Sequence, residues 1–282
     1  MRFDYHMHFE YGDYDLSWAQ GFFDAAESHN LDEIGISEHS HTFPEFKKFY
    51  YDDLILDSSA VGDFQKRWLQ KNKFKHTFQE YFDFMRTLQT RHKVKIGIEV
   101  CNFSNQAAVK KILDAWPFDY RIGSVHFLWG WGFDAADLLD EWLNHDLEKI
   151  YDEYASQAEL LAGSGNYDIL GHPFNLRLFN FFPDFDATIY FERVVAAMKK
   201  FNLAVDVNTG TLYRYPVREI SPCPEFMKIA AAYGLKITIN SDAHRPQDCG
   251  KFFDLAADYV RQFGFKKILL FHNRTPQEVD LT

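Results

Sequence analysis

Two histidines, His6 and His8, stand two residues apart in the stretch 2–9 at the start of the chain. In an extended strand, residues i and i+2 lie on the same face, so the two imidazoles would point the same way. Histidines on buried strands also occur with ordinary hydrogen-bond partners, so the pair alone is weak evidence for a metal site. The pair gains meaning from the residues that end the later apolar stretches.

Nearly every later stretch with strand character ends in a residue type that binds metals. Glu99 is informative because it lies within the apolar stretch 94–100, where a carboxylate is costly to bury unless it is paired or metal-bound. Asp13 follows the first stretch, with Asp15 as a rival, although both could instead cap the helix expected after them. The complete set of candidate ligands is His6, His8, Asp13, His39, Glu99, His126, His172, Asp242 and His244.

This set predicts a site for several transition-metal ions. Its six imidazoles and three carboxylates suit zinc, iron or manganese better than calcium or magnesium, which prefer oxygen ligands. Nine ligands exceed the need of one ion, so two or three divalent ions that share bridging carboxylates are expected. Such ions lower the pKa of bound water from ~15.7 towards ~7 and hold the attacking and leaving oxygens of a phosphoryl transfer. We predict a direct part in catalysis for Glu99, Asp242 and His244.

Short apolar stretches alternate with helix-like segments along the chain, which is typical of a parallel α/β sheet with right-handed crossovers. About seven or eight such units predict closure into a barrel, with the ligands at the carboxyl-terminal mouth of the strands. The 282 residues, 46% of them hydrophobic, suffice for one barrel-sized domain, and no linker divides them, so residues 1–282 are predicted to form a single domain. The predicted helices span roughly 17–30, 77–92, 105–115, 146–163, 187–201, 223–233 and 247–263.

Two segments near the predicted mouth lack the character of plain connectors. Residues 42–75 are rich in aromatic and charged residues without a clear period, which predicts an insertion that serves as a lid or as a subunit contact. The stretch 127–134 is rich in aromatic residues and glycine, and it either packs over the barrel mouth or forms a wall of the substrate pocket. Under the second interpretation, Trp129 and Trp131 bind the organic part of the substrate.

Two arginines are candidates for binding a phosphate group. Arg177 follows the Gly-His-Pro stretch, and Arg214 lies in the loop after Asn208. A guanidinium group matches phosphate oxygens in a bidentate manner. Surface ion pairing is the alternative for both residues, with Arg218 and Arg245 as competitors.

Two further residues are candidates for supporting roles. Asp4 lies on the same strand face as His6, where it would either orient a ligand histidine or make a hydrogen bond in the core. His41, two residues after His39, is expected at most to contact a ligand and not to bind metal itself.

The composition excludes several classes of partner. The formal net charge of −11 argues against binding to a nucleic-acid backbone, because that binding depends on lysine and arginine. Three scattered cysteines indicate neither a disulfide framework nor a thiolate zinc site, and they favour a reducing compartment. No apolar run of about 18 residues predicts a membrane span, and the first residues lack a signal-peptide pattern. We therefore expect a cytoplasmic protein with a small phosphorylated substrate, and its oligomeric state stays open.

The order of these motifs resembles the PHP (polymerase and histidinol phosphatase) family along essentially the whole chain. The resemblance rests on His-x-His at the start, Glu-His after the second stretch, Glu99, Ser-x-His, Gly-His-Pro and Ser-Asp-Ala-His. The stretches 207–210, 221–226 and 240–244 are most similar to its histidinol-phosphatase branch. The resemblance implies a distorted, TIM-like (β/α)7 barrel with three metal ions. It places His6, His8, Glu99 and Asp242 around one ion, Glu99, His126 and His172 around a second, and Asp13, His39 and His244 around a third.

The resemblance further implies a metal-dependent phosphomonoesterase that hydrolyses L-histidinol phosphate, in histidine biosynthesis, by attack of a metal-bridging hydroxide. Two alternatives stay open: a PHP-type phosphoesterase for phosphotyrosine protein or a phosphodiester, and a barrel that binds metal without catalysis. Against the latter, structural metal sites are usually closed and need about four ligands. Close relatives tend to have an acidic residue at the position of Trp129, so recognition of a cationic histidinol group is an open point in this chain.

Overall fold

The computed structural model describes residues 1–71 and 73–281, and its main feature is a parallel β-sheet. In this part of the chain the sheet has seven strands, and their spatial order is their chain order. Each ladder between neighbours is parallel, as expected for strands joined by helical crossovers. The barrel strands are β1 (Phe3–Asp4), β2 (Glu33–His39), β3 (Val94–Cys101), β4 (Tyr120–Ser124), β7 (Ile169–Leu170), β8 (Ala204–Asn208) and β9 (Ile237–Asn240). The other strands of the described residues form two hairpins, β5 (Phe127–Leu128) with β6 (Trp131–Gly132) and β10 (Lys267–His272) with β11 (Thr275–Asp280).

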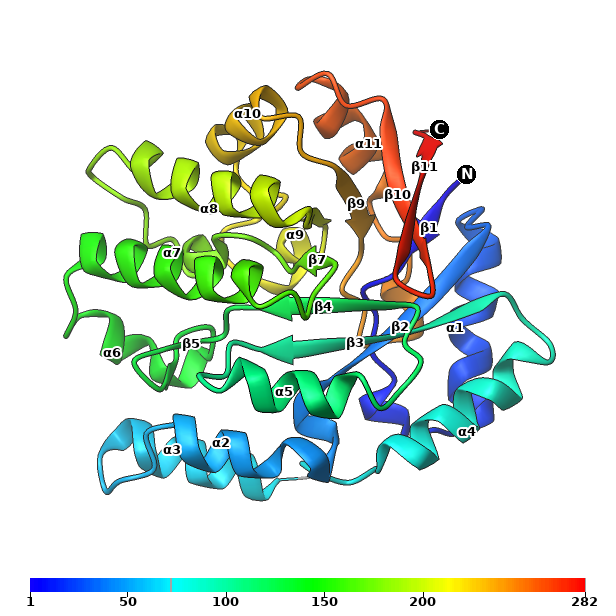
Figure 1. Cartoon of the computed structure of the whole chain (residues 1–282), viewed down its shortest axis with the longest axis horizontal. Coiled ribbons are helices and arrows are strands. Elements are labelled where there is room, and N and C mark those ends of the chain that lie inside the picture. Colours follow the sequence, from blue (N-terminus) through cyan, green and yellow to red (C-terminus); the bar gives the residue numbers. More distant parts are fainter. Residues whose placement is uncertain (72, 282) are drawn as a thin grey trace.

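The sheet curls into a nearly closed barrel, because its first and last strands meet. The backbone nitrogen of Tyr5 donates to Asn240 Oδ1 at 2.8 Å, and the nitrogen of His8 donates to the Ala243 oxygen at 2.9 Å. Met7 and Ala243 form a further parallel bridge. Figure 1 shows the helices around the outside of these strands. The predicted α/β fold, a TIM-like barrel of seven strands, is therefore confirmed.

Helices connect the strands, and polar side chains mark where several of them begin. Asp15 accepts a hydrogen bond from the Trp18 nitrogen at the start of the first helix, so it takes the capping role that its residue type allows. Thr77 and Glu80 form a capping box at the start of the fourth. None of the helices in the described residues is both long and apolar enough to cross a membrane. The α-helices are α1 (Leu16–Ser28), α2 (Lys47–Asp53), α3 (Ala60–Gln70), α4 (Phe78–Gln89), α5 (Gln106–Leu113), α6 (Leu139–Trp142), α7 (Leu147–Gly163), α8 (Thr188–Phe201), α9 (Thr211–Arg214), α10 (Pro224–Ala232) and α11 (Phe253–Arg261).

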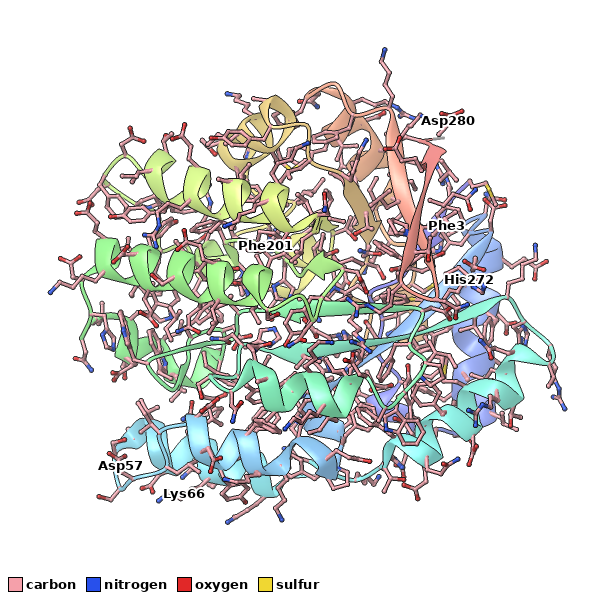
Figure 2. The ribbon with its side chains drawn as sticks, viewed as in Figure 1. Phe3, Asp57, Lys66, Phe201, His272 and Asp280 are labelled. Atoms are coloured by element: carbon pink, nitrogen blue, oxygen red, sulfur yellow. The ribbon has the colours of Figure 1, made fainter. Side chains whose placement is uncertain are left out.

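The hairpin of β10 and β11 covers the amino-terminal end of the barrel, and Figure 2 marks its two ends with His272 and Asp280. The last short apolar stretch of the chain, at 267–271, therefore forms a strand of this hairpin and not of the barrel sheet. Arg274, in the turn, pairs with the Asp168 carboxylate at 2.9 Å, just before β7. This ion pair holds the hairpin across the end where the barrel strands begin.

Aromatic rings fill the barrel interior near this end. Tyr5 and Tyr120 are buried and stacked, with ring centroids 5.1 Å apart. Glycine is required beside them, because a Cβ atom at Gly97 would lie 2.2 Å from the Tyr120 ring. Since rings occupy the amino-terminal half, the polar side chains of the barrel gather in the carboxyl-terminal half.

The segment 42–75, apart from residue 72, packs at the end of the barrel toward which the arrows of β3 and β4 point in Figure 1. It contains α2 and α3. Gln65 joins it to the β5–β6 hairpin, because its Nε2 donates to the Gly130 oxygen at 3.0 Å and its Oε1 accepts from the Gly132 nitrogen at 2.8 Å. The described part of the segment is therefore a packed wall beside the barrel mouth.

Candidate metal centre

The barrel strands bring eight of the nine predicted ligands together at their carboxyl-terminal ends. Glu99 lies within β3, and His39 is the last residue of β2. Others stand two residues beyond the ends of β1, β4, β7 and β9. Parallel strands end at the same edge of a barrel, so these side chains converge on its mouth. The eight residues are His6, His8, His39, Glu99, His126, His172, Asp242 and His244.

Glu99 lies at the centre of this cluster and is almost fully buried. Its Oε1 is 3.2 Å from His172 Nε2 and 3.3 Å from His6 Nε2, and its Oε2 is 3.1 Å from His39 Nε2. Burial raises the pKa of Glu99, but the charges of His6 and His126 outweigh burial and hold the pKa well below its usual value. Glu99 is therefore an ionised carboxylate shared among several imidazoles, the arrangement that a bridge between metal ions requires.

Nitrogen atoms without partners show that the cluster fits metal ions. In the part of the chain that the structure describes, His6 Nε2 and His8 Nε2 are buried and have no hydrogen-bond partner. Buried polar atoms of this kind are costly unless a ligand satisfies them. Several triads have their ligand atoms within 4.8 Å of one another, and three of them are His6, His8 and Glu99; Glu99, His126 and His172; and His8, His39 and His244.

A carboxylate behind the cluster, Asp206 of β8, orients two of the histidines. Asp206 Oδ2 is 2.9 Å from His6 Nδ1, and it accepts a hydrogen bond from the His172 backbone nitrogen at 2.9 Å. The contact at Nδ1 leaves His6 Nε2 free to bind a metal ion. Asp4, the candidate from the sequence, instead accepts a hydrogen bond from the Ser241 nitrogen at 3.0 Å, and burial raises its pKa to about 6. The core hydrogen-bond interpretation of Asp4 is therefore the correct one.

Asp13 does not join the cluster, which corrects the ligand set expected for the third ion. Its exposed carboxylate lies 2.6 Å from Lys75 Nζ and 2.5 Å from His76 Nε2. The physical reason is local: the chain forms a short 3-10 helix at Glu10–Gly12, and Asp13 then adopts a left-handed conformation with φ of 54°. This turn directs the carboxylate toward the surface.

Glu10 lies where Asp13 was expected. Its Oε2 is 3.7 Å from His39 Nδ1, and its Oε1 is 3.8 Å from His244 Nε2. The same Oε2 is 3.7 Å from His41 Nε2 and 4.0 Å from Lys73 Nζ. Glu10 therefore supplies the carboxylate that stands next to His39 and His244, and His41 lies close behind it.

Arg214, at the end of α9, faces the cluster. Its Nη1 lies 2.7 Å from His244 Nδ1, and its Nη2 donates to Asp242 Oδ2. Burial lowers the pKa of His244 well below its usual value, and the charge of Arg214 lowers it further. The neutral imidazole that results is the form that binds metals. Arg214 thus lies beside the ligands, where an anion would meet it.

The three other predicted substrate-binding residues lie away from the cluster. Arg177 forms a bidentate ion pair with Glu219 at 2.9 to 3.1 Å, so the ion-pair interpretation applies to it. Trp131 is buried and stacks on His145 with ring centroids 5.2 Å apart. Trp129 is 45% exposed and stacks on the same histidine. Both tryptophans therefore pack against His145, and neither of them lines a cavity at the barrel mouth.

Two cavities adjoin at the barrel mouth. The metal-side cavity, of about 80 Å³, is lined by most of the ligand residues together with Arg214 and Tyr215. The aromatic cavity, of about 250 Å³, is lined by Phe64 and Trp68 of α3 and by Phe127, among others. The first cavity has the size for a small anion and presents Arg214 to it, and the second suits an apolar group.

Three residues of the site, Glu10, Asp134 and Asp206, were not singled out from the sequence. Asp206 lies in an apolar strand just as Glu99 does, so the cost of burying a carboxylate indicated it equally. Glu10 stands two residues after His8, as His8 stands two residues after His6, so the same strand-face rule indicated it. Asp134 follows an aromatic hairpin, and no local pattern marks it.

The chain belongs to the PHP domain family, whose model matches residues 4–210. Among curated proteins, a probable histidinol-phosphatase from Deinococcus radiodurans is 33% identical over 186 residues, which are 65% of this chain and 70% of the relative. A probable phosphatase from Vibrio vulnificus is 36% identical over 101 residues, or 36% of each chain. These relatives confirm the predicted family and the predicted hydrolase class.

A solved structure has the same fold. It is the crystal structure of histidinol phosphate phosphatase from Lactococcus lactis, complexed with zinc, L-histidinol and phosphate. It aligns over 98% of both chains with a TM-score of 0.73, at 19% sequence identity. The barrel is therefore shared along nearly the whole length of the two proteins.

Proposed function

We propose that this chain is a metal-dependent phosphomonoesterase that hydrolyses L-histidinol phosphate to L-histidinol and phosphate. The observation that carries the proposal is the buried Glu99 carboxylate among imidazoles at the barrel mouth, with Arg214 beside it. The name of the Deinococcus radiodurans relative and the ligands of the Lactococcus lactis structure support the choice of substrate.

The proposal includes two to three divalent transition-metal ions, namely zinc, iron or manganese. When bound, such ions lower the pKa of water and neutralise charge on a phosphoryl group. The buried nitrogens without partners and the shared carboxylate support this part of the proposal. The ligand groups that we propose are His6, His8, Glu99 and Asp242; Glu99, His126 and His172; and Glu10, His39 and His244.

The roles of the chain's own residues follow from their contacts. Arg214 donates to phosphate oxygens in the metal-side cavity, and such charge-assisted hydrogen bonds contribute about 1.5–3 kcal/mol each. Asp242 and His244 contact the guanidinium group and hold it toward that cavity. The Glu99 carboxylate holds the imidazoles that contact it, such as that of His6, close to its own oxygens. Asp206 fixes the orientation of the His6 ring.

The dimensions of the site support a small substrate. Cavities of about 80 and 250 Å³ accommodate a phosphate group and a small organic group. A net charge of −11 disfavours a nucleic-acid partner. Because strands from Phe3–Asp4 to Ile237–Asn240 all contribute to the mouth, we propose that residues 1–282 act as one catalytic domain.

Metal content and phosphate release, measured together, test the proposal. The panel consists of L-histidinol phosphate, a phosphotyrosine peptide and bis(p-nitrophenyl) phosphate. We expect two to three ions per chain, fastest release from L-histidinol phosphate, and loss of activity in a chelator that added metal restores. Protein without metal after metal-replete purification would refute the metal site, and preference for the peptide or the diester would refute the substrate.

A further inference from the structure

The metal-side cavity and the aromatic cavity meet at three shared residues. His39, His126 and Asp134 line both of them. The metal-side cavity contains the ligand residues and Arg214, so it accommodates the phosphate group of an ester. The aromatic cavity begins where that site ends, so the organic group of a bound ester extends into it.

Aromatic side chains of the segment 42–75 form the outer wall of the aromatic cavity. Phe64 and Trp68 lie one turn apart on the same face of α3. The Trp68 ring is held by an edge contact with His41, with ring centroids 5.1 Å apart. Phe127 lines the cavity from the barrel side. Walls of this kind favour a planar ring, which can stack on one side chain and meet the edge of another.

Asp134 is the acidic residue of the aromatic cavity. Within residues 1–71 and 73–281, no other residue forms a hydrogen bond or a close ion pair with its carboxylate. Asp134 lines the metal-side cavity as well, so its carboxylate lies where the two cavities meet. A cationic nitrogen of a ligand in the aromatic cavity would give this carboxylate a charged hydrogen-bond donor.

We propose that the aromatic cavity binds the organic group of the phosphate ester and that Asp134 accepts a hydrogen bond from a cationic nitrogen of that group. The inference rests on the proposed function and names its class of substrate: phosphomonoesters of a small alcohol that carries a planar ring and a cationic nitrogen. The volume of about 250 Å³ lies just below the roughly 300–1,000 Å³ of small-molecule pockets, which suits an alcohol of the size of L-histidinol. Phe64, Trp68 and Asp134, in place of Trp129 and Trp131, then determine specificity.

Competitive inhibition distinguishes binding in the aromatic cavity from binding in the metal-side cavity. With p-nitrophenyl phosphate as substrate, L-histidinol and inorganic phosphate are tested as separate inhibitors of the wild type and of Asp134→Asn. We expect the variant to raise the Ki of L-histidinol about 10- to 100-fold, as for the loss of one hydrogen bond between charged groups. The Ki of phosphate should not rise, because the carboxylate that is removed also lines the metal-side cavity and repels an anion there. Equal changes in both constants, or no change in either, would overturn the proposal.

Trp68→Leu tests the aromatic wall, with Tyr51→Ala as a matched control in the same segment. Tyr51 is an exposed aromatic residue of α2 and lines neither cavity. We expect Trp68→Leu to lower kcat/KM for L-histidinol phosphate about tenfold more than for glycerol phosphate, because only the first ester has a ring. Tyr51→Ala should keep the ratio of the wild type. An unchanged ratio in Trp68→Leu contradicts a wall that contacts the substrate.

Calorimetry makes the test independent of turnover. L-histidinol is titrated into the metal-loaded wild type and into metal-loaded Asp134→Asn, with metal content verified in both. Binding to the wild type that is weakened in the variant supports the subsite even if no ester is hydrolysed. Hydrolysis of L-histidinol phosphate with equal L-histidinol binding in both proteins supports the proposed function alone and overturns the role of Asp134.

Discussion

Replacing Glu10 by glutamine tests where a third metal ion binds, and Asp13→Asn is its matched control. Each substitution keeps the size of a side chain and removes one negative charge. We expect Glu10→Gln to weaken the binding of one ion, because Glu10 lies beside His39 and His244. Asp13→Asn should keep every ion, because the Asp13 carboxylate is exposed and paired with Lys75.

The size of the effect follows from the distances around Glu10. Its oxygens lie 3.7 Å from His39 Nδ1 and 3.8 Å from His244 Nε2, and ligand atoms ~2.1 Å from a tetrahedral zinc ion are about 3.4 Å apart. Loss of a group that supports a metal ligand typically costs about 10- to 100-fold in metal affinity. Since the glutamine amide oxygen can still coordinate, we expect a loss within this range, about 30-fold in Kd or roughly 2 kcal/mol.

A competition titration with zinc against a chromophoric chelator resolves the ions one after another, and elemental analysis counts them. The wild type, Glu10→Gln and Asp13→Asn are compared at the same pH and salt concentration. An ion lost in Asp13→Asn, together with unchanged affinities in Glu10→Gln, would refute the assignment of Glu10 and restore the one favoured by the sequence.

Other substitutions test the remaining parts of the site. Glu99→Gln should cost at least one ion and nearly all phosphate release, and elemental analysis with steady-state kinetics decides; full metal content and turnover would exclude a bridging role. Asp206→Asn should lower metal affinity about 10- to 100-fold, measured by chelator competition, with an unchanged circular dichroism spectrum; unchanged affinity would make Asp206 a core residue only. Arg214→Ala should lower kcat/KM for every phosphomonoester by about 1.5–3 kcal/mol, roughly 10- to 150-fold, whereas Arg177→Ala should retain the activity of the wild type. Comparable losses in both arginine variants would contradict the separation of their sites.

The positions of most ligands could be predicted from the sequence because they depend on local rules. A strand alternates its faces every two residues, and parallel strands end at one edge, so His126 and His172 meet although 46 residues separate them. The place of Glu99 in the cluster could be predicted for a different reason, because the cost of burying its carboxylate is visible in the apolar stretch around it.

The residues that were misplaced depend on geometry that no local pattern encodes. Asp13 adopts a left-handed backbone conformation that turns its carboxylate outward to His76, whereas the carboxylate of Glu10 faces the cluster. Trp131 looks like a pocket residue in the sequence, but its ring is covered by His145 and Trp142, which come from a later part of the chain. Packing between distant segments decides such cases.

The wall made by the segment 42–75 has a consequence for how the protein can change. The ligands come from strand ends that the barrel ladders hold, whereas Phe64 and Trp68 come from a helix inserted between β2 and β3 and attached through Gln65. Under the proposed function, substitutions on this one helix would alter the choice of alcohol and leave the cluster at the strand ends intact. Exchange of the stretch between homologues would test this separation by a change in selectivity.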